Sequence, residues 1–350
     1  MSDTQPSSPE ATLMHQEAAA AADVVAAQYR HNRQAVMDAA AQIRAFGPRA
    51  VVTLARGSSD HAATYAKYLV ETRLSLLTSS AAPSVSSVYK RAPQLEGTLF
   101  IAISQSGKSP DLLAGVEQAR ASGALTLAFV NVEDSPLAEL ADIVIPLCAG
   151  QERSVAATKS YIATLAAIVD LVAELSGDDD LKLARERLSQ QLASAWANDW
   201  SAAGADLLRS ANNLFVIGRG LGFGVALEAA LKFKETCGLH AEGYSAAEVK
   251  HGPMAIVHKD FPVLAFAQQD ETRETLDALV DEFRQRGARV LYAAEGADGP
   301  WTLPVVAGAH PATAPILAIQ SFYRMANSLA LIRGYNPDTP QYLNKVTETL

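Results

Sequence analysis

Glu228, Lys232 and Glu235 lie four and then three positions apart in the stretch EAALKFKETCGLHAEGYSAAEVKHGP, which ends at Pro253. In a helix, this spacing places the three side chains on one face. Carboxylates beside an ammonium group can move protons. The same spacing also produces ion pairs on a solvated helix face, worth about 0.2–0.5 kcal/mol each. The spacing alone favours these surface ion pairs.

The same stretch contains two histidines. His251 precedes Gly252-Pro253, which predicts a rigid chain reversal. A loop histidine can serve as a general acid or base near neutral pH, or it can simply cap the turn. His240 lies eleven positions before His251, and no H-x-x-x-H pattern is present. A zinc site at these two histidines is therefore not expected.

Hydroxyl groups gather after two predicted strands. RGSS at 56–59 follows the apolar run 50–55, and SQSGKSPD at 104–111 follows the apolar run 99–103. Ser109-Pro110 is typical of a helix start. Unpaired N–H groups at a helix N-terminus attract anions, and serine hydroxyls add further donors. One such loop could be an ordinary capped turn, but two adjacent loops favour a bound phosphate. The equivalent second-half loop, AQQDE at 267–271, carries acids instead.

These loops need a frame of parallel strands. Apolar runs typical of buried strands alternate with helical periodicity and fall at 50–55, 99–103, 125–130, 143–147, 214–217, 263–266, 290–293 and 303–306. Arg219-Gly220 follows Arg56-Gly57 by 163 positions, and Gln268 follows Gln105 by the same offset. The alternation predicts an α/β fold with two tandem doubly wound parallel sheets, produced by an internal duplication. In such sheets, ligands bind at the carboxyl ends of the strands.

The chain divides accordingly into five segments. The sequence predicts a disordered tail (1–12), an N-terminal helix with a first α/β domain that carries the phosphate loop (13–180), a helical linker (181–210), a second α/β domain (211–335) and a C-terminal tail (336–350).

Composition narrows the class of protein. The formal net charge of −9 argues against a nucleic-acid surface, which needs a basic field. No apolar run reaches the ~18 residues that a membrane span requires, and the N-terminus lacks the plan of a signal peptide. Cys148 and Cys237 form no C-x-x-C pattern and lie in apolar stretches. A disulfide framework is not expected, and a reducing cytoplasm is the expected location.

Five motifs in this order carry a resemblance to a known family: ARGSSDHA, SQSGKSPD, ERSVAATKS, ALEAALKFKETCGLHAEGYSAAEVKHGPMAIV and DTPQYLNKVTETL. The chain resembles the SIS (sugar isomerase) family from about residue 40 onward. It is similar to the isomerase half of glucosamine-6-phosphate synthase, and to the stand-alone SIS-type glucosamine-6-phosphate deaminases. The resemblance implies two flavodoxin-like SIS domains and a phosphorylated amino-sugar substrate.

The resemblance also implies roles for individual residues. The residues that would hold the sugar phosphate are Ser59, Ser104, Gln105, Ser106 and Ser109. Ser58 and Val155 would contact the sugar, and Glu228 and Lys232 would line its pocket.

Three further residues would be catalytic. Glu235 would move the proton between C1 and C2, which suits a carboxylate that takes a proton and returns it. His251 would catalyse ring opening and would enter the site from the neighbouring subunit, which implies a homodimer with shared active sites. Lys345 would close over the sugar, with a covalent or an electrostatic role left open. No metal and no organic cofactor is expected.

Two departures from the synthase pattern set the expected reaction. The synthase begins with a glutaminase domain whose first residue is a catalytic cysteine, and nothing like it precedes Leu13 here. Ala157 in SVAATK replaces a serine that touches the sugar in the synthase, as in the stand-alone deaminases. The expected reaction is the isomerising deamination of glucosamine 6-phosphate to fructose 6-phosphate and ammonia, without glutaminase activity.

Two alternatives remain open at the level of sequence. One is a deglycase, deaminase or aldose–ketose isomerase that acts on another sugar phosphate. The other is a non-catalytic SIS protein that senses a sugar phosphate. A sensor would need the serine loop but would not need Glu235, His251 and Lys345 together.

Overall fold

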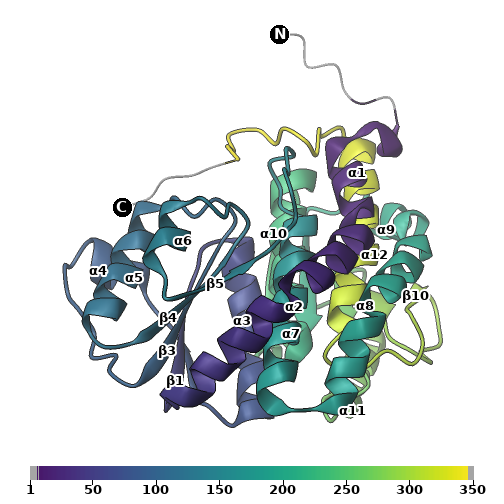
Figure 1. The fold of residues 1–350 in the computed structure, drawn as a ribbon. Coiled ribbons are helices and arrows are strands. Elements are labelled where there is room, and N and C mark those ends of the chain that lie inside the picture. The colour runs from purple at the N-terminus through teal and green to yellow at the C-terminus, as the bar shows by residue number, and fades with distance from the viewer. Residues whose placement is uncertain (1–5, 7, 346–350) are drawn as a thin grey trace. The chain divides into compact units, whose positions relative to one another are not determined.

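The computed structural model describes residue 6 and residues 8–345, which form two compact units. The first-sheet unit comprises Asp23–Glu152 and Ser160–Glu186. The second-sheet unit comprises the described residues up to Ala22, with Arg153–Lys159 and Arg187–Lys345. Each unit is built on one five-stranded parallel sheet (Figure 1). The predicted fold class, with two tandem doubly wound sheets, is confirmed.

The sheet of the first-sheet unit has the order β2-β1-β3-β4-β5, with all neighbours parallel. Its strands are β1 (Ala50–Leu54), β2 (Thr78–Ser80), β3 (Thr98–Ser104), β4 (Leu125–Val130) and β5 (Ile143–Pro146). All seven residues of the central strand β3 are buried. Burial on both faces explains why this strand reads as a continuous apolar run.

Helices cover both faces of this sheet (Figure 1). They are α2 (Ala21–Phe46), α3 (Ser58–Leu74), α4 (Pro83–Ser87), α5 (Pro110–Ala121), α6 (Pro136–Leu140) and α7 (Lys159–Ser176), followed by α8 (Asp179–Ala197), which is divided between the units. On one face, Leu112 and Val116 of α5 pack in a cluster with Phe100 of β3. On the other face, Val70 of α3 and Ile168 of α7 line an apolar cavity over the sheet.

The second-sheet unit repeats this plan. Its sheet has the order β10-β9-β8-β6-β7 and is built from β6 (Asn213–Gly218), β7 (His240–Ser245), β8 (Pro262–Phe266), β9 (Arg289–Ala293) and β10 (Thr302–Leu303). Its helices are η1 (Pro9–Ala11), α1 (Leu13–Ala19), α9 (Ser201–Leu208), α10 (Leu221–Cys237), η2 (Glu248–His251), η3 (Pro253–Ile256), α11 (Arg273–Gln285) and α12 (Ala314–Ile332). Numbered within its own half, each sheet has the flavodoxin-like order 2-1-3-4-5. This shared order supports the inferred duplication.

The second sheet also packs on both faces. Leu279 and Phe283 of α11 cluster with Val263 on one face. On the other face, Phe322 of α12 makes edge contacts with Phe233 of α10 and Phe266 of β8, at ring-centroid distances of 5.0 and 6.4 Å. No helix in the described part of the chain is both long enough and apolar enough to cross a bilayer.

The structure corrects the expected elements in several places. β2 and β7 were not predicted. The N-terminal helix expected at the start of the segment 13–180 is two helices, α1 and α2, with a turn at Ala20. Within the expected disordered tail, Pro9–Ala11 form a 3-10 helix, while residues 1–5 and 7 lie outside the described part.

Candidate active site

The serine-rich loops lie at the carboxyl edge of the first sheet. β1 and β3 are parallel neighbours, with Leu54 in register with Ala102, so the segments that follow them emerge at the same edge. Ser58 and Ser59 form the start of α3, after Gly57 with a φ of 55°. The loop after β3 holds the other predicted phosphate-binding residues, which are Ser104, Gln105, Ser106 and Ser109.

The loop after β3 has a defined shape. The Gly107 N–H donates to Oγ of Ser104 at 3.0 Å. Gly107 has a φ of 65°, and a Cβ there would lie 2.1 Å from Oγ of Ser135. Glycine is therefore required at this turn on both conformational and steric grounds. Ser109 occupies the N-cap position of α5 without making a side-chain cap hydrogen bond. A loop of hydroxyls at a helix N-terminus is suited to an anion.

Arg56 adds a cation that was not singled out from sequence. Its Nη2 and Nε lie 2.7 and 2.8 Å from Oδ2 of Asp111, in the first turn of α5. The Asp111 side chain is fully buried, whereas that of Arg56 is 49% exposed. The buried carboxylate thus holds an accessible guanidinium beside the serine loop. Asp111 lies within the quoted motif SQSGKSPD, but only the fold shows that it reaches Arg56.

A second chemical group lies on α10. Lys232 is placed between two carboxylates, with its Nζ 3.3 Å from Oε1 of Glu228 and 2.5 Å from Oε2 of Glu235. The side chains of Glu228 and Lys232 are 0% and 1% exposed, and that of Glu235 is 22% exposed. The surface ion pairs favoured by spacing alone are therefore wrong, because α10 packs against α12 and the sheet. We call these three residues the buried triad.

Lys232 remains protonated in this setting. Burial by itself lowers the pKa of Lys232, but the charges of Glu228 and Glu235 outweigh it and raise the pKa above the ordinary value of 10.5. Tyr323 of α12 completes the group by donating from its hydroxyl to Oε1 of Glu228 at 3.2 Å. Tyr323 was not singled out from sequence, because it lies 95 positions from Glu228.

Val155 and Lys345 lie in segments that are held in place by hydrogen bonds to Glu17 and Asp338. Glu17 of α1 accepts from the Ser154 N–H at 3.1 Å. Asp338 accepts from the Leu13 and Met14 N–H groups at 2.8 Å each, and its carbonyl accepts from the Val155 N–H at 3.1 Å. These bonds explain why Arg153–Lys159 groups with the second-sheet unit instead of lying inside a first domain over 13–180.

Lys345 is the last described residue, half-buried at the end of the chain segment that Asp338 anchors. The remainder of the predicted C-terminal tail, residues 346–350, lies outside the described residues.

His251 lies on a different element from the triad. It ends η2, is exposed, and precedes Gly252, which has a φ of 141°. Lys250 pairs with Glu282 of α11 at 2.9 Å, and Glu242 accepts from the Tyr244 hydroxyl at 3.1 Å. These contacts give Lys250 and Glu242 structural partners within the same unit.

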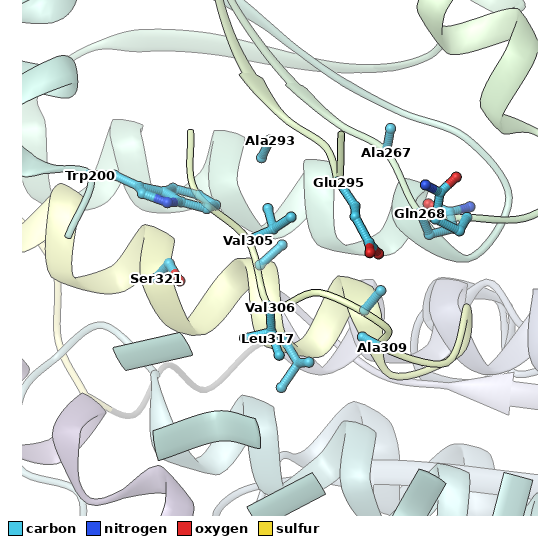
Figure 2. A pocket seen from close by; sticks show the side chains of 13 residues that line it. Trp200, Ala267, Gln268, Ala293, Glu295, Val305, Val306, Ala309, Leu317 and Ser321 are labelled. Atoms are coloured by element: carbon cyan, nitrogen blue, oxygen red, sulfur yellow. The ribbon is translucent and has the colours of Figure 1, made fainter. Parts of the chain in front are cut away.

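The second-half counterpart of the serine loop is closed by its own side chains. The Gln268 amide donates to Oδ2 of Asp270 at 2.9 Å and to Oγ1 of Thr272 at 3.0 Å. Figure 2 shows the pocket beside it, where the side chain of Glu295 extends between Gln268 and Val305. This cavity is about 30 Å³, enough for one or two water molecules. Its size and its carboxylate make it unsuited to a sugar phosphate.

The structure thus assembles two groups, each within its own unit. One is the set of serine-loop residues with Arg56. The other is the buried triad with Tyr323. Apart from Arg56 and Tyr323, the residues of the two groups had been selected from sequence.

Comparison with known proteins gives a consistent set of relatives. The SIS domain family matches residues 46–173 and 207–302. Glutamine–fructose-6-phosphate aminotransferase (isomerizing) from Symbiobacterium thermophilum is 34% identical over 323 residues, which cover 87% of this chain and 52% of that protein. The chain spans about half the length of the curated relatives it matches.

Solved structures show the same likeness. A protein from Silicibacter pomeroyi, provisionally named a phosphosugar isomerase, is 41% identical, with a TM-score of 0.89 over 93% of this chain and 100% of that one. Glucosamine-6-phosphate deaminase from Thermotoga maritima is 21% identical, with a TM-score of 0.79 over 97% of this chain and 100% of that one. At that identity, the second likeness concerns the fold alone.

Proposed function

The chain belongs to the SIS domain family, and we propose that it is an enzyme that converts glucosamine 6-phosphate to fructose 6-phosphate and ammonia by isomerising deamination. The observation that carries the proposal is the buried triad, in which Glu235 is the partly exposed carboxylate. Families of sugar-phosphate isomerases act by proton transfer between adjacent carbons. A positioned carboxylate beside a fixed cation is the equipment for that step.

We assign substrate anchoring to the serine loop. The phosphate-binding residues are Ser59, Ser104, Gln105, Ser106 and Ser109, with Arg56 as an additional cation. The N-terminus of α5, the hydroxyls and the guanidinium all favour an anion. We place Ser58 and Val155 at the sugar. A phosphate held away from the reacting carbons supplies orientation to the proton transfer.

Glu235 is the proton-transfer group in this proposal. Lys232 stays charged and orients the Glu235 carboxylate through their 2.5 Å contact. Glu228 is fully buried and balances the ammonium from the other side. Of the two carboxylates, only Glu235 has surface that a substrate can reach. The base is therefore Glu235, and Glu228 with Lys232 positions it.

The reaction then follows in three steps. His251 assists the opening of the sugar ring by proton transfer at the ring oxygen. Glu235 removes the proton from C2 of the open-chain aldehyde and delivers it to C1, while the C1 oxygen takes up the proton that the nitrogen loses, which leaves an imine at C2. Water adds to this imine and ammonia departs, giving the ketone of fructose 6-phosphate. Lys345 supplies a cation near the sugar. The deamination consumes only water besides the amino sugar, so no further reactant is needed.

The exposure of His251 supports a shared site. His251 lies on a different element from the buried triad and is exposed, so a neighbouring molecule can reach it. We propose that His251 enters the site of a second copy of this chain, so that the active enzyme is a homodimer.

The direct test is to incubate the purified protein with glucosamine 6-phosphate and to measure ammonia and fructose 6-phosphate. The proposal expects both products in equal amounts. N-acetylglucosamine 6-phosphate, other amino-sugar phosphates and fructosamine 6-phosphate should be tested in parallel. Turnover of one of these compounds without turnover of glucosamine 6-phosphate would replace the substrate assignment. Tight binding of several sugar phosphates with no turnover would instead support the sensor interpretation.

A further inference from the structure

Three potential metal ligands from distant parts of the sequence meet in the first-sheet unit. His31 lies on α2, Glu133 lies on the loop after β4, and Cys148 follows β5. Their ligand atoms all lie within 4.8 Å of one another. His31 and Glu133 are exposed, and Cys148 is half-buried, so an ion from solvent can reach all three.

The backbone around Cys148 is fixed in an unusual conformation. Cys148 has a φ of 52°, in the left-handed region that residues other than glycine rarely adopt. Asn32 of α2 donates to the Pro146 carbonyl at 2.6 Å, and Asn131 accepts from the Ala149 N–H at 2.8 Å. These bonds tie the backbone on both sides of Cys148 to α2 and to the loop after β4, and the Cys148 thiol itself donates to Oδ1 of Asn32 at 3.6 Å. Strained conformations held in this way concentrate at functional positions.

We propose that His31, Glu133 and Cys148 form a zinc-binding site. An imidazole nitrogen, a carboxylate oxygen and a thiolate are the three donor types that Zn²⁺ takes in proteins. Three protein ligands leave a fourth tetrahedral position for water. Mg²⁺ and Ca²⁺ prefer all-oxygen sites, so the thiol and the imidazole select against them. The sequence placed Cys148 in apolar surroundings, and only the fold brings the histidine and the carboxylate to it.

Charge and proton balance are simple at this site. Binding displaces one proton from the Cys148 thiol, while His31 binds as the neutral imidazole and Glu133 as the carboxylate. The two negative ligands then neutralise the Zn²⁺ charge. Because Zn²⁺ binding releases the proton of the Cys148 thiol, the affinity for zinc should rise with pH until the thiol is ionised.

The site lies outside the proposed proton-transfer machinery but next to the serine loop. Ser135, two residues after Glu133, is the residue whose Oγ a Cβ at Gly107 would meet. Zinc at Glu133 would thus tie α2 and the segment after β5 to the loop that packs on Gly107. We expect it to stabilise this unit and not to take part in the reaction.

The test uses full-length protein freed of metal by a chelator and titrated with Zn²⁺ and with Co²⁺. We expect one equivalent of Zn²⁺ to bind and to raise the melting temperature, since a ligand that binds the folded state stabilises it. Bound Co²⁺ should show a near-ultraviolet thiolate-to-cobalt charge-transfer band. Cys148→Ser should abolish that band and weaken Zn²⁺ binding at least tenfold, and His31→Gln and Glu133→Gln should each weaken it similarly.

Matched variants control for general thiol, imidazole and carboxylate effects. They are Cys237→Ser, His258→Gln and Glu139→Gln, which alter the same residue types elsewhere in the chain. All three should keep wild-type Zn²⁺ binding. Circular dichroism of each metal-free variant checks that it folds. The proposal would be overturned if wild-type protein bound no tight equivalent of Zn²⁺. It would also be overturned if Cys148→Ser kept both the wild-type Zn²⁺ affinity and the wild-type cobalt spectrum.

Discussion

Lys232 and Glu235 lie in contact on the same helix, with Nζ of the lysine 2.5 Å from Oε2 of the glutamate. The lysine side chain is 1% exposed and also faces the fully buried carboxylate of Glu228. A buried ammonium is costly unless it is paired, and here both pairing groups lie on α10. The triad therefore links the stability of the second-sheet unit to the position of the proposed base.

Removing the ammonium should destabilise the fold. Lys232→Met keeps most of the side-chain volume but leaves the buried Glu228 carboxylate without its cation, which should cost about 3–5 kcal/mol of unfolding free energy. Lys234→Met, which removes an exposed lysine from the same helix, is the control and should change the unfolding free energy by less than about 0.5 kcal/mol. Urea unfolding measures both. Equal stability of the two variants would show that the triad is not a buried ion group.

Lys232 should also make the unfolding free energy depend on pH in the alkaline range. Because the folded-state pKa of Lys232 is raised above 10.5, its stabilising contribution is fully present below the unfolded pKa and is lost as pH rises through the folded pKa. The difference in unfolding free energy between wild type and Lys232→Met should therefore be constant from neutral pH to about pH 10 and should shrink above it. If the difference in unfolding free energy already shrank between pH 6 and pH 9, the pKa of Lys232 would be lowered in the folded protein, which contradicts this prediction.

Arg56 should strengthen phosphate binding. Charge-assisted hydrogen bonds contribute about 1.5–3 kcal/mol, so Arg56→Met should weaken the binding of inorganic phosphate and of the sugar phosphate by roughly ten- to hundredfold. Arg49→Met is the control, because Arg49 is an exposed arginine of the same unit that precedes β1. Isothermal titration calorimetry compares the two variants. Similar small losses of phosphate affinity in both variants would show that Arg56 acts only through its general positive charge and makes no specific contact with the phosphate.

The shared-site proposal predicts complementation. Glu235→Gln and His251→Ala should each be inactive as homodimers. If His251 acts in the site of the other copy, a mixed dimer of the two variants contains one site with neither change, and mixing after dissociation should restore a sizeable fraction of wild-type activity. The control mixes each variant with itself. Failure to recover activity, when mass measurements show mixed dimers, would place both residues in the site of a single chain.

The fold could be predicted from the sequence where a strand contains a run of apolar residues. β1, β3, β4, β5, β6, β8, β9 and β10 were all predicted, because each coincides with or overlaps such a run. β2 and β7 were missed. They occupy the same edge position in their sheets, and Thr78–Ser80 and His240–Ser245 keep polar side chains exposed. A strand made mostly of polar residues cannot be detected from a run of apolar residues.

The site was predicted unevenly for a related reason. Local spacing identified Glu228, Lys232 and Glu235 as one helix face, but only the packing of α12 determines that this face is buried. Tyr323 and the pair formed by Arg56 and Asp111 depend on contacts between distant segments. Such contacts leave no trace in one sequence. The same holds for the meeting of His31 with Cys148.

The central claim is that Glu235 carries the proton from C2 to C1, and Glu235→Gln tests it most directly. This variant keeps the shape and one hydrogen-bonding oxygen but cannot act as a base. We predict that it binds glucosamine 6-phosphate within a few-fold of wild type by calorimetry, while ammonia release falls by at least ~10²-fold. Ammonia release at the wild-type rate from this variant would contradict the account.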